Sequence, residues 1–129
     1  MKKTLSFLLL PMFLLTGCTS PVPTAGTYRQ IAAQEAADMM ARETGYIILD
    51  VRSPQEYAAG HIPGAILIPN ETIGSAAIPE LPDKNQLIMV YCRSGNRSKQ
   101  AAEKLVRQGY TNIVEFGGIG SWTGELTRD

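Results

Sequence analysis

The stretch that most constrains the fold is a short apolar run followed by a polar, glycine-containing segment and then by helix-favouring sequence. The apolar run, residues 87–90, has the length and bulk of a buried strand. Residues 99–108 have the composition of a helix with one apolar face. Between them lies the segment Tyr91-Cys92-Arg93-Ser94-Gly95-Asn96-Arg97-Ser98. A cysteine therefore falls where a strand ends and a helix is about to begin.

The position of this cysteine favours a reactive thiol. A turn into a helix leaves backbone N–H groups without intrahelical partners, and together with the helix dipole they bind negative charge. Arg93 and Arg97 add positive charge. Because such a loop stabilises the thiolate, Cys92 is predicted to ionise easily and to act as a nucleophile. The alternative is a small buried apolar residue at a strand end, a common place for free cysteine.

Composition excludes several classes of function. The chain has 129 residues, of which 44% are hydrophobic and 19% charged, as in one small globular domain. Its formal net charge is zero and it has no basic run, so we expect no nucleic-acid partner. His61 is the only histidine, and we expect no metal site and no cofactor. Cys92 has no disulfide partner if Cys18 is modified.

The N-terminus has the pattern of a targeting segment. Two lysines precede an apolar run over residues 5–15, which is too short to span a bilayer. Leu15-Thr16-Gly17-Cys18 resembles the lipobox of bacterial lipoprotein signals. This resemblance implies a signal peptide over residues 1–17 and a lipid on Cys18, which would anchor the chain to a membrane. The alternative is an ordinary secretory signal.

The segment after the lipobox predicts a tether and a location. Residues 18–27 are small, polar and proline-bearing, as in a flexible linker. Thr19, rather than aspartate, follows Cys18. The resemblance then implies a cell-envelope protein, on the periplasmic side of the outer membrane if the source is Gram-negative. We expect residues 28–129 to form the single folded domain.

The rest of the chain alternates between helix and strand signals. Helices are predicted over residues 31–44, over residues 54–59 after a capping box at Ser53, and weakly within 70–82. Strands are predicted over residues 46–51, 65–68 and 111–116. This alternation predicts an α/β fold with a parallel sheet covered by helices on both faces.

Several separate segments resemble one family. They are, in order, Asp50-Val51-Arg52, Glu56-Tyr57, Gly60-His61-Ile62-Pro63-Gly64-Ala65, the cysteine segment from Val90 to Ser98, and Gly117-Gly118-Ile119 before Trp122. From about Tyr28 to the last residue the sequence resembles a single-domain rhodanese, the sulfurtransferase module. The resemblance implies a five-stranded parallel sheet with helices on both faces and a persulfide-forming Cys92.

The family's chemistry implies a role for each residue of the loop. Thiolate Cys92 would take the outer sulfur of a donor such as thiosulfate and pass it to a thiol or cyanide. The loop residues Arg93, Ser94, Gly95, Asn96, Arg97 and Ser98 would bind the donor and the persulfide through their N–H groups. The two arginines would attract the anionic donor, and Arg97 has the alternative role of a structural clasp.

Other polar residues are assigned supporting roles. Asp50, Arg52 and Glu56 are expected to fix the turn after the first long strand, with Arg52 reaching either acid. His61 is expected to pack in its turn and not to be catalytic. Trp122 is expected to anchor the core.

Three other functions compete with sulfur transfer. A phosphatase is disfavoured because four residues lie between Cys92 and Arg97, one fewer than in tyrosine-phosphatase loops. A binding module without catalysis is disfavoured by the presence of the cysteine and both arginines. An envelope thiol-redox or sulfur-relay partner stays open, and it depends on an exposed cysteine of low pKa. We expect a monomer.

Overall fold

The computed structural model describes residues 26–129, so the expected signal peptide, Cys18 and nearly all of the tether lie outside the described residues. In chain order the elements are β1 (Arg29–Gln30), α1 (Ala33–Arg42), β2 (Ile47–Asp50), α2 (Pro54–Ala59), β3 (Ile66–Leu67), the 3-10 turn η1 (Asn70–Thr72), β4 (Ile88–Cys92), α3 (Asn96–Arg107), β5 (Ile113–Gly118) and the 3-10 turn η2 (Ile119–Ser121). Within this part of the chain, no helix is both long and apolar enough to cross a bilayer.

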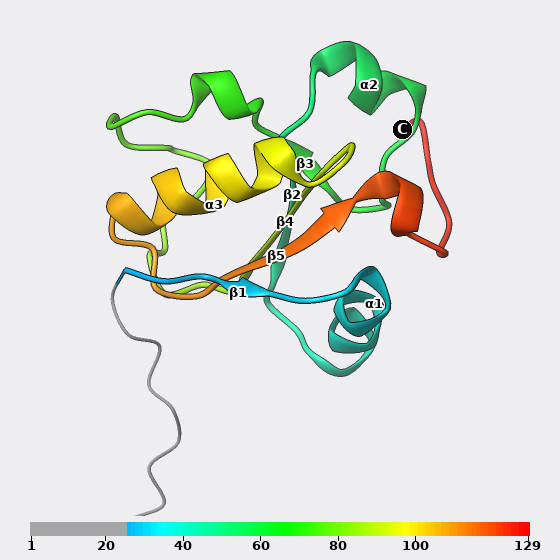
Figure 1. Cartoon of the computed structure of the whole chain (residues 1–129), viewed down its shortest axis with the longest axis horizontal. Coiled ribbons are helices and arrows are strands. Elements are labelled where there is room, and N and C mark those ends of the chain that lie inside the picture. The colour runs from blue at the N-terminus through cyan, green and yellow to red at the C-terminus, as the bar shows by residue number, and fades with distance from the viewer. Residues whose placement is uncertain (1–25) are drawn as a thin grey trace, which may run out of the picture.

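The strands form one parallel sheet with the order β1-β5-β4-β2-β3 (Figure 1). The strand that carries Cys92, β4, is the central one, and all its residues are buried. A strand buried on both faces has a continuous apolar sequence, as β4 does. The predicted α/β class with a five-stranded parallel sheet is confirmed.

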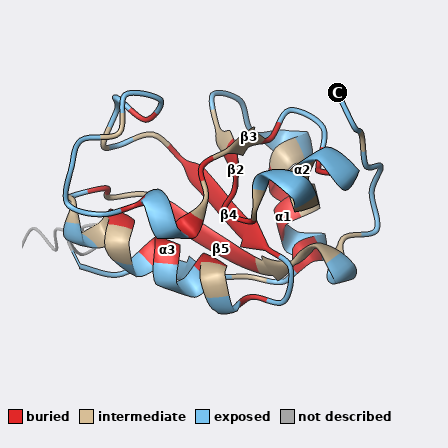
Figure 2. Ribbon diagram, turned by 90° about the horizontal axis from the view of Figure 1, so that it is seen from above, coloured by how far each residue is buried: buried red, intermediate tan, exposed pale blue. Residues whose placement is uncertain are grey.

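Helices cover both faces of the sheet, and each face has its own apolar cluster (Figure 2). The α3 face is filled by Ala101, Ala102 and Leu105 of that helix, packed on side chains of β2, β4 and β5. The opposite face is filled from α1, with Tyr57 of α2 packed at its margin. The core thus has two layers, as the alternation of helix and strand predicted.

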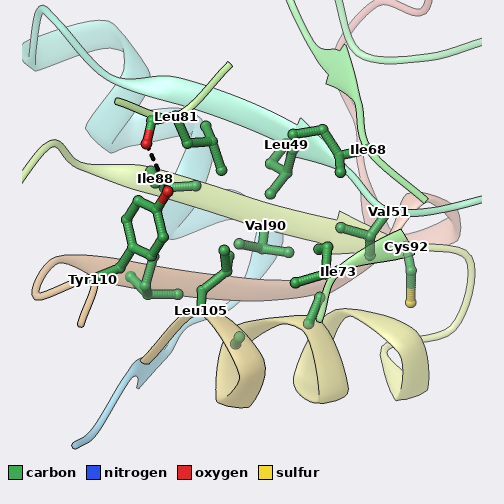
Figure 3. Packing of buried hydrophobic residues seen from close by; sticks show 13 residues of the cluster. Leu49, Val51, Ile68, Ile73, Leu81, Ile88, Val90, Cys92, Leu105 and Tyr110 are labelled. Carbon is green, nitrogen blue, oxygen red and sulfur yellow. Dashed lines mark hydrogen bonds between the residues drawn. The ribbon is translucent and has the colours of Figure 1, made fainter. Parts of the chain in front are cut away.

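Cys92 lies at one end of the α3-side cluster, and its sulfur points toward the start of α3 (Figure 3). At the other end, the Tyr110 hydroxyl donates a hydrogen bond to the Leu81 carbonyl oxygen over 2.6 Å. The long connection between β3 and β4 is therefore held against the sheet by a buried contact.

The structure differs from the sequence predictions at three places. The helix expected within residues 70–82 is wrong beyond the turn Asn70–Thr72, because Gly74, Pro79 and Pro82 interrupt any longer helix. The edge strand β1 was missed because it has two exposed residues and no periodic pattern. Helix α3 begins at Asn96 and not at residue 99, so the last part of the cysteine segment belongs to the first turn of the helix.

Candidate active site

The central strand and α3 meet at the cysteine. Cys92 is the last residue of β4, and Gly95 is the N-cap of α3 with a φ of 100°. This left-handed conformation is open to glycine and costly for a side chain, so Gly95 lets the chain turn into the helix within three residues. The sulfur consequently lies beneath the first turn of α3.

The sulfur of Cys92 is hydrogen-bonded to this turn. The Gly95 N–H donates to Sγ over 2.9 Å, and the Ser98 hydroxyl oxygen lies 3.3 Å from Sγ. Burial opposes ionisation of the thiol most strongly, but the Ser98 hydroxyl and the N–H groups of Ser98, Gly95 and Ser94 together outweigh it. The pKa of Cys92 therefore lies below its ordinary value.

The expectation of an exposed cysteine is wrong. Cys92 has 0% of its surface exposed and packs with Val51, Val90 and Ala101 in the α3-side cluster. The two alternatives for this residue, a buried strand-end cysteine and a hydrogen-bonded ionisable one, therefore occur together. Of the loop residues, Arg93, Ser94 and Asn96 are exposed, whereas Gly95 and Ser98 are buried.

Behind Ser98 lies a buried acid that the sequence analysis missed. The Ser98 hydroxyl is 2.6 Å from Oε1 of Glu115, and the Gly117 N–H donates to the same oxygen over 2.8 Å. Glu115 is 2% exposed and belongs to β5. An acid between Val114 and Phe116 in a predicted buried strand was the signal that could have found it, because strand alternation places it on one face of the core.

Arg97 pairs with an acid on another helix. Its guanidinium donates to both carboxylate oxygens of Glu56, over 2.7 and 3.0 Å. The hydrogen bonds from Arg97, assisted by those of Ser53, lower the pKa of Glu56 from 4.5 to about 2, against the effect of burial. Arg97 thus acts as a clasp between α3 and α2, through Glu56 and not through loop carbonyls.

Arg52 pairs with Asp50, the first of its two expected partners. The guanidinium and Asp50 Oδ2 lie 2.7 Å apart, and Arg52 also donates to the Gly60 carbonyl oxygen over 2.7 Å. The Tyr91 hydroxyl donates to the same Asp50 oxygen over 2.7 Å. This buried network fixes the turn after β2 beside the residue that precedes Cys92.

The end of β5 packs directly under the cysteine loop. A side chain on Gly118 would place its Cβ 2.2 Å from the backbone oxygen of Arg93. In the sheet register Cys92 is paired with Gly118. The glycines of the Gly117-Gly118 pair thus allow the backbone of the loop to lie against the last strand.

A hollow of about 270 Å³ opens beside the loop, lined by Arg52, Glu56, Ala59, Gly60, Arg93, Ile119 and Leu126. Its lining combines two arginines and one acid with the apolar residues Ala59, Ile119 and Leu126. His61 lies outside it, buried in its turn and stacked on Tyr57 at 3.6 Å between ring centroids. Trp122 is half-buried against Phe116 on the other face of the sheet. Across residues 26–129, no group of three or more His, Cys, Asp or Glu is placed to hold a metal ion.

Comparison with known proteins agrees with this arrangement. Residues 32–125 match the model of the family described as "Rhodanese-like domain". The chain belongs to this family. It is 41% identical over 71 residues to thiosulfate sulfurtransferase PspE of Escherichia coli K12, covering 55% of this chain and 68% of that protein. It is 35% identical over 94 residues to a sulfurtransferase of Allochromatium vinosum, covering 72% of this chain and 86% of that protein.

Solved structures of rhodanese-like proteins have the same fold. A rhodanese with anions from E. coli superposes with a TM-score of 0.60 at 34% identity, covering 65% of this chain and 99% of that one. A rhodanese-like domain protein from Staphylococcus aureus superposes with a TM-score of 0.66 at 31% identity, covering 78% of this chain and 98% of that one. The fold of the described residues is therefore a single rhodanese-like domain.

Proposed function

We propose that the chain is a sulfurtransferase that carries a sulfane sulfur as a persulfide on Cys92. The observation that carries this proposal is the 2.9 Å hydrogen bond from the Gly95 N–H to a sulfur that also contacts the Ser98 hydroxyl. A sulfur held in this way is poised to be a thiolate, the nucleophilic form of cysteine. Family membership and the names of the two relatives support the same reaction class.

The reaction takes place in two half-reactions. The Cys92 thiolate attacks the outer sulfur of a donor such as thiosulfate, the S–S bond of the donor breaks, and sulfite leaves with the bonding electrons. A thiolate or cyanide then attacks the terminal sulfur of the persulfide, and the Cys92 sulfur leaves with its electrons as the thiolate again. Each half-reaction balances without a cofactor. Because the first product leaves before the acceptor reacts, the mechanism predicts ping-pong kinetics.

The residues around the sulfur have different roles in this reaction. The N–H groups of the turn from Ser94 to Ser98 stabilise negative charge on the thiolate and on the persulfide. Arg97 is compensated by Glu56, so we assign the attraction of the anionic donor mainly to Arg93, which is exposed and borders the hollow. Of the loop residues, Arg93 alone is among the residues that line the hollow.

The burial of the Cys92 sulfur argues against the alternative function, a redox cycle with another protein. A mixed disulfide with another protein requires the partner's sulfur to reach Cys92 Sγ, which is fully enclosed in the structure. A small donor has a much lower steric requirement than a protein thiol. The structure therefore favours small-molecule sulfur transfer over a protein redox cycle.

The test is to incubate the purified full chain with thiosulfate and to measure the mass of the Cys92 peptide. We expect a gain of one sulfur atom on Cys92, its loss on addition of cyanide or a thiol, and neither event in Cys92→Ser. Peptide mapping separates Cys92 from Cys18. Full transfer activity in Cys92→Ser would overturn the assignment. Hydrolysis of an aryl phosphate at a rate comparable to sulfur transfer would favour a phosphatase.

A further inference from the structure

Leu126 is the only large apolar side chain that is exposed among residues 26–129. It belongs to the last segment of the chain, and 52% of its surface is accessible to solvent. A single exposed leucine needs no explanation on most protein surfaces, but this one lines the hollow beside the cysteine loop. A leucine in that place can contact a molecule that reacts at the loop.

The segment that carries Leu126 is held against the end of α2 and the turn after it (Figure 1). The Thr127 N–H donates to the His61 carbonyl oxygen over 2.8 Å, and the His61 N–H donates to the Thr127 carbonyl oxygen over 2.9 Å. The Arg128 side chain donates to the Ala59 carbonyl oxygen over 3.3 Å. Because its neighbours are fixed in this way, the backbone of Leu126 is in place before a ligand arrives, which lowers the entropy cost of binding.

The lining of the hollow combines one uncompensated charge with apolar surface. The guanidinium of Arg52 is paired with Asp50. The carboxylate of Glu56 is paired with Arg97. None of the ion pairs among the described residues involves Arg93, which is exposed. The apolar part of the lining is Ala59, Ile119 and Leu126. The hollow therefore fits a small molecule with one negative charge and a hydrocarbon arm.

The size of the hollow also suits an organic molecule. Its volume of about 270 Å³ is just below the range of small-molecule sites, about 300–1,000 Å³. Thiosulfate and cyanide have no hydrocarbon part and would leave Leu126 without a contact. An organic thiol has a carbon chain that can cover Leu126 while its sulfur lies toward Arg93, the residue that directly follows Cys92. Contacts made by a part of the substrate that does not react can then favour the part that does.

We propose that Leu126 is a specificity-determining residue that selects, as the sulfur acceptor, an organic thiol with an apolar arm over cyanide. The thiolate of this acceptor attacks the outer sulfur of the Cys92 persulfide. The S–S bond to Cys92 breaks, its electrons leave with the Cys92 sulfur as a thiolate, and the acceptor departs as an organic persulfide. The arm of the acceptor lies against Leu126. The proposal rests on the proposed function in that Cys92 carries the persulfide.

The first test measures binding with probes that cannot accept sulfur. Ethane-, propane- and butane-1-sulfonate have the same charge and differ only in the length of the arm. We expect the NMR signals of the Leu126 methyl groups in the full chain to shift on titration. The dissociation constant should fall about twofold to fourfold for each added methylene. Leu126 signals that do not move, or a dissociation constant that does not depend on arm length, would overturn the proposal.

The second test compares two substitutions of Leu126 with the same probes. Leu126→Ser removes the apolar contact, whereas Leu126→Met keeps an apolar side chain at this position. The side chain is exposed, so we expect both variants to fold, and their NMR spectra check this. The dependence on arm length should be lost in Leu126→Ser and retained in Leu126→Met and in the surface control Glu103→Gln. Its full retention in Leu126→Ser contradicts the assignment.

The third test measures the choice of acceptor. The full chain is loaded with thiosulfate, and the persulfide of Cys92 is then discharged with ethanethiol or butane-1-thiol, whose thiol groups have nearly the same pKa. The rate constant for butane-1-thiol should exceed that for ethanethiol about 4-fold to 16-fold in the unsubstituted chain, and the two should be nearly equal in Leu126→Ser. Equal rate constants in the unsubstituted chain count against the proposal.

The binding and transfer readouts separate this proposal from the proposed function. Sulfonate binding that depends on Leu126, in a chain that takes no sulfur from thiosulfate, would show that the hollow binds as proposed and would contradict the proposed function. Sulfur transfer without any dependence on the acceptor's arm would contradict only the role of Leu126.

Discussion

Gly95 serves the sulfur of Cys92 in two ways. Its positive φ of 100° turns the chain from β4 into α3, and its N–H donates to Sγ over 2.9 Å. The same residue thus positions the helix start and helps to lower the pKa of the thiol beneath it. Burial and ionisation, which normally oppose each other, are reconciled here by backbone hydrogen bonds.

The substitution Gly95→Ala tests both effects. The left-handed conformation is strained for alanine, so we expect the free energy of unfolding to fall by about 1 to 2 kcal/mol. Relaxation of the strain should also move the N–H away from the sulfur, so the pKa of Cys92 should rise. Urea unfolding and the pH profile of alkylation measure the two changes.

Gly109→Ala is the matched control for this substitution. Gly109 has a φ of 96° and open space where a Cβ would stand, and it lies at the other end of α3. It should lose similar stability with no change in the pKa of Cys92. Equal changes in thiol reactivity for both variants would show that the Gly95 N–H has no particular role.

At the scale of elements, the Glu56–Arg97 ion pair joins α2 to α3. The pair lowers the pKa of Glu56 in the folded state to about 2, so its stabilisation is fully present above about pH 4.5 and is lost as the pH falls toward 2. We expect Glu56→Gln to cost about 1 kcal/mol at pH 7, because the two side chains are about 30% exposed and solvent screens the pair.

The measurement for Glu56→Gln is urea unfolding between pH 7 and pH 2.5. The difference between the variant and the unsubstituted chain should shrink as the pH falls. Glu103→Gln, which removes a more exposed pair to Arg107 at 3.8 Å, should show no measurable change at any pH. A deficit in Glu56→Gln that stays constant with pH would mean that the ion pair does not carry the effect, since glutamine can keep the capping box at Ser53.

The elements that the sequence could predict are those with a strong local signal. The buried strand before Cys92 and the helix after Gly95 could be placed because apolar runs and helical faces are set by neighbouring residues. The capping box at Ser53 and Glu56 forms as predicted, because its hydrogen bonds are local. The cysteine loop could be located from the same sequence.

Features that depend on distant residues could not be predicted. β1 exists because it pairs with β5, which follows it by more than eighty residues. The partner of Arg97 is on another helix, forty-one positions away. The role of Glu115 depends on Ser98, seventeen positions earlier. The burial of Cys92 depends on packing from three strands and α3. The sequence alone therefore predicted a more exposed cysteine than the structure has.

At the scale of the whole molecule, we propose that the domain is tethered to a bacterial membrane through a lipid on Cys18. Full-length chain produced in a Gram-negative host should sediment with membranes and incorporate labelled fatty acid. Cys18→Ala should appear in the fraction without membranes, with no label. Membrane association that persists in Cys18→Ala, without label in either form, would contradict the lipoprotein prediction. Cys92→Ser is the matched control and should keep the label.

The contact between Gly118 and the Arg93 backbone has a consequence for protein engineering. A designer who grafts the cysteine segment alone onto another parallel sheet would meet a side chain from the adjacent strand where this chain has none, with a Cβ 2.2 Å from a backbone oxygen. The graft would be pushed off the sheet, and its amides would no longer converge on the sulfur. The transferable unit is therefore two strand ends and a helix start, taken together.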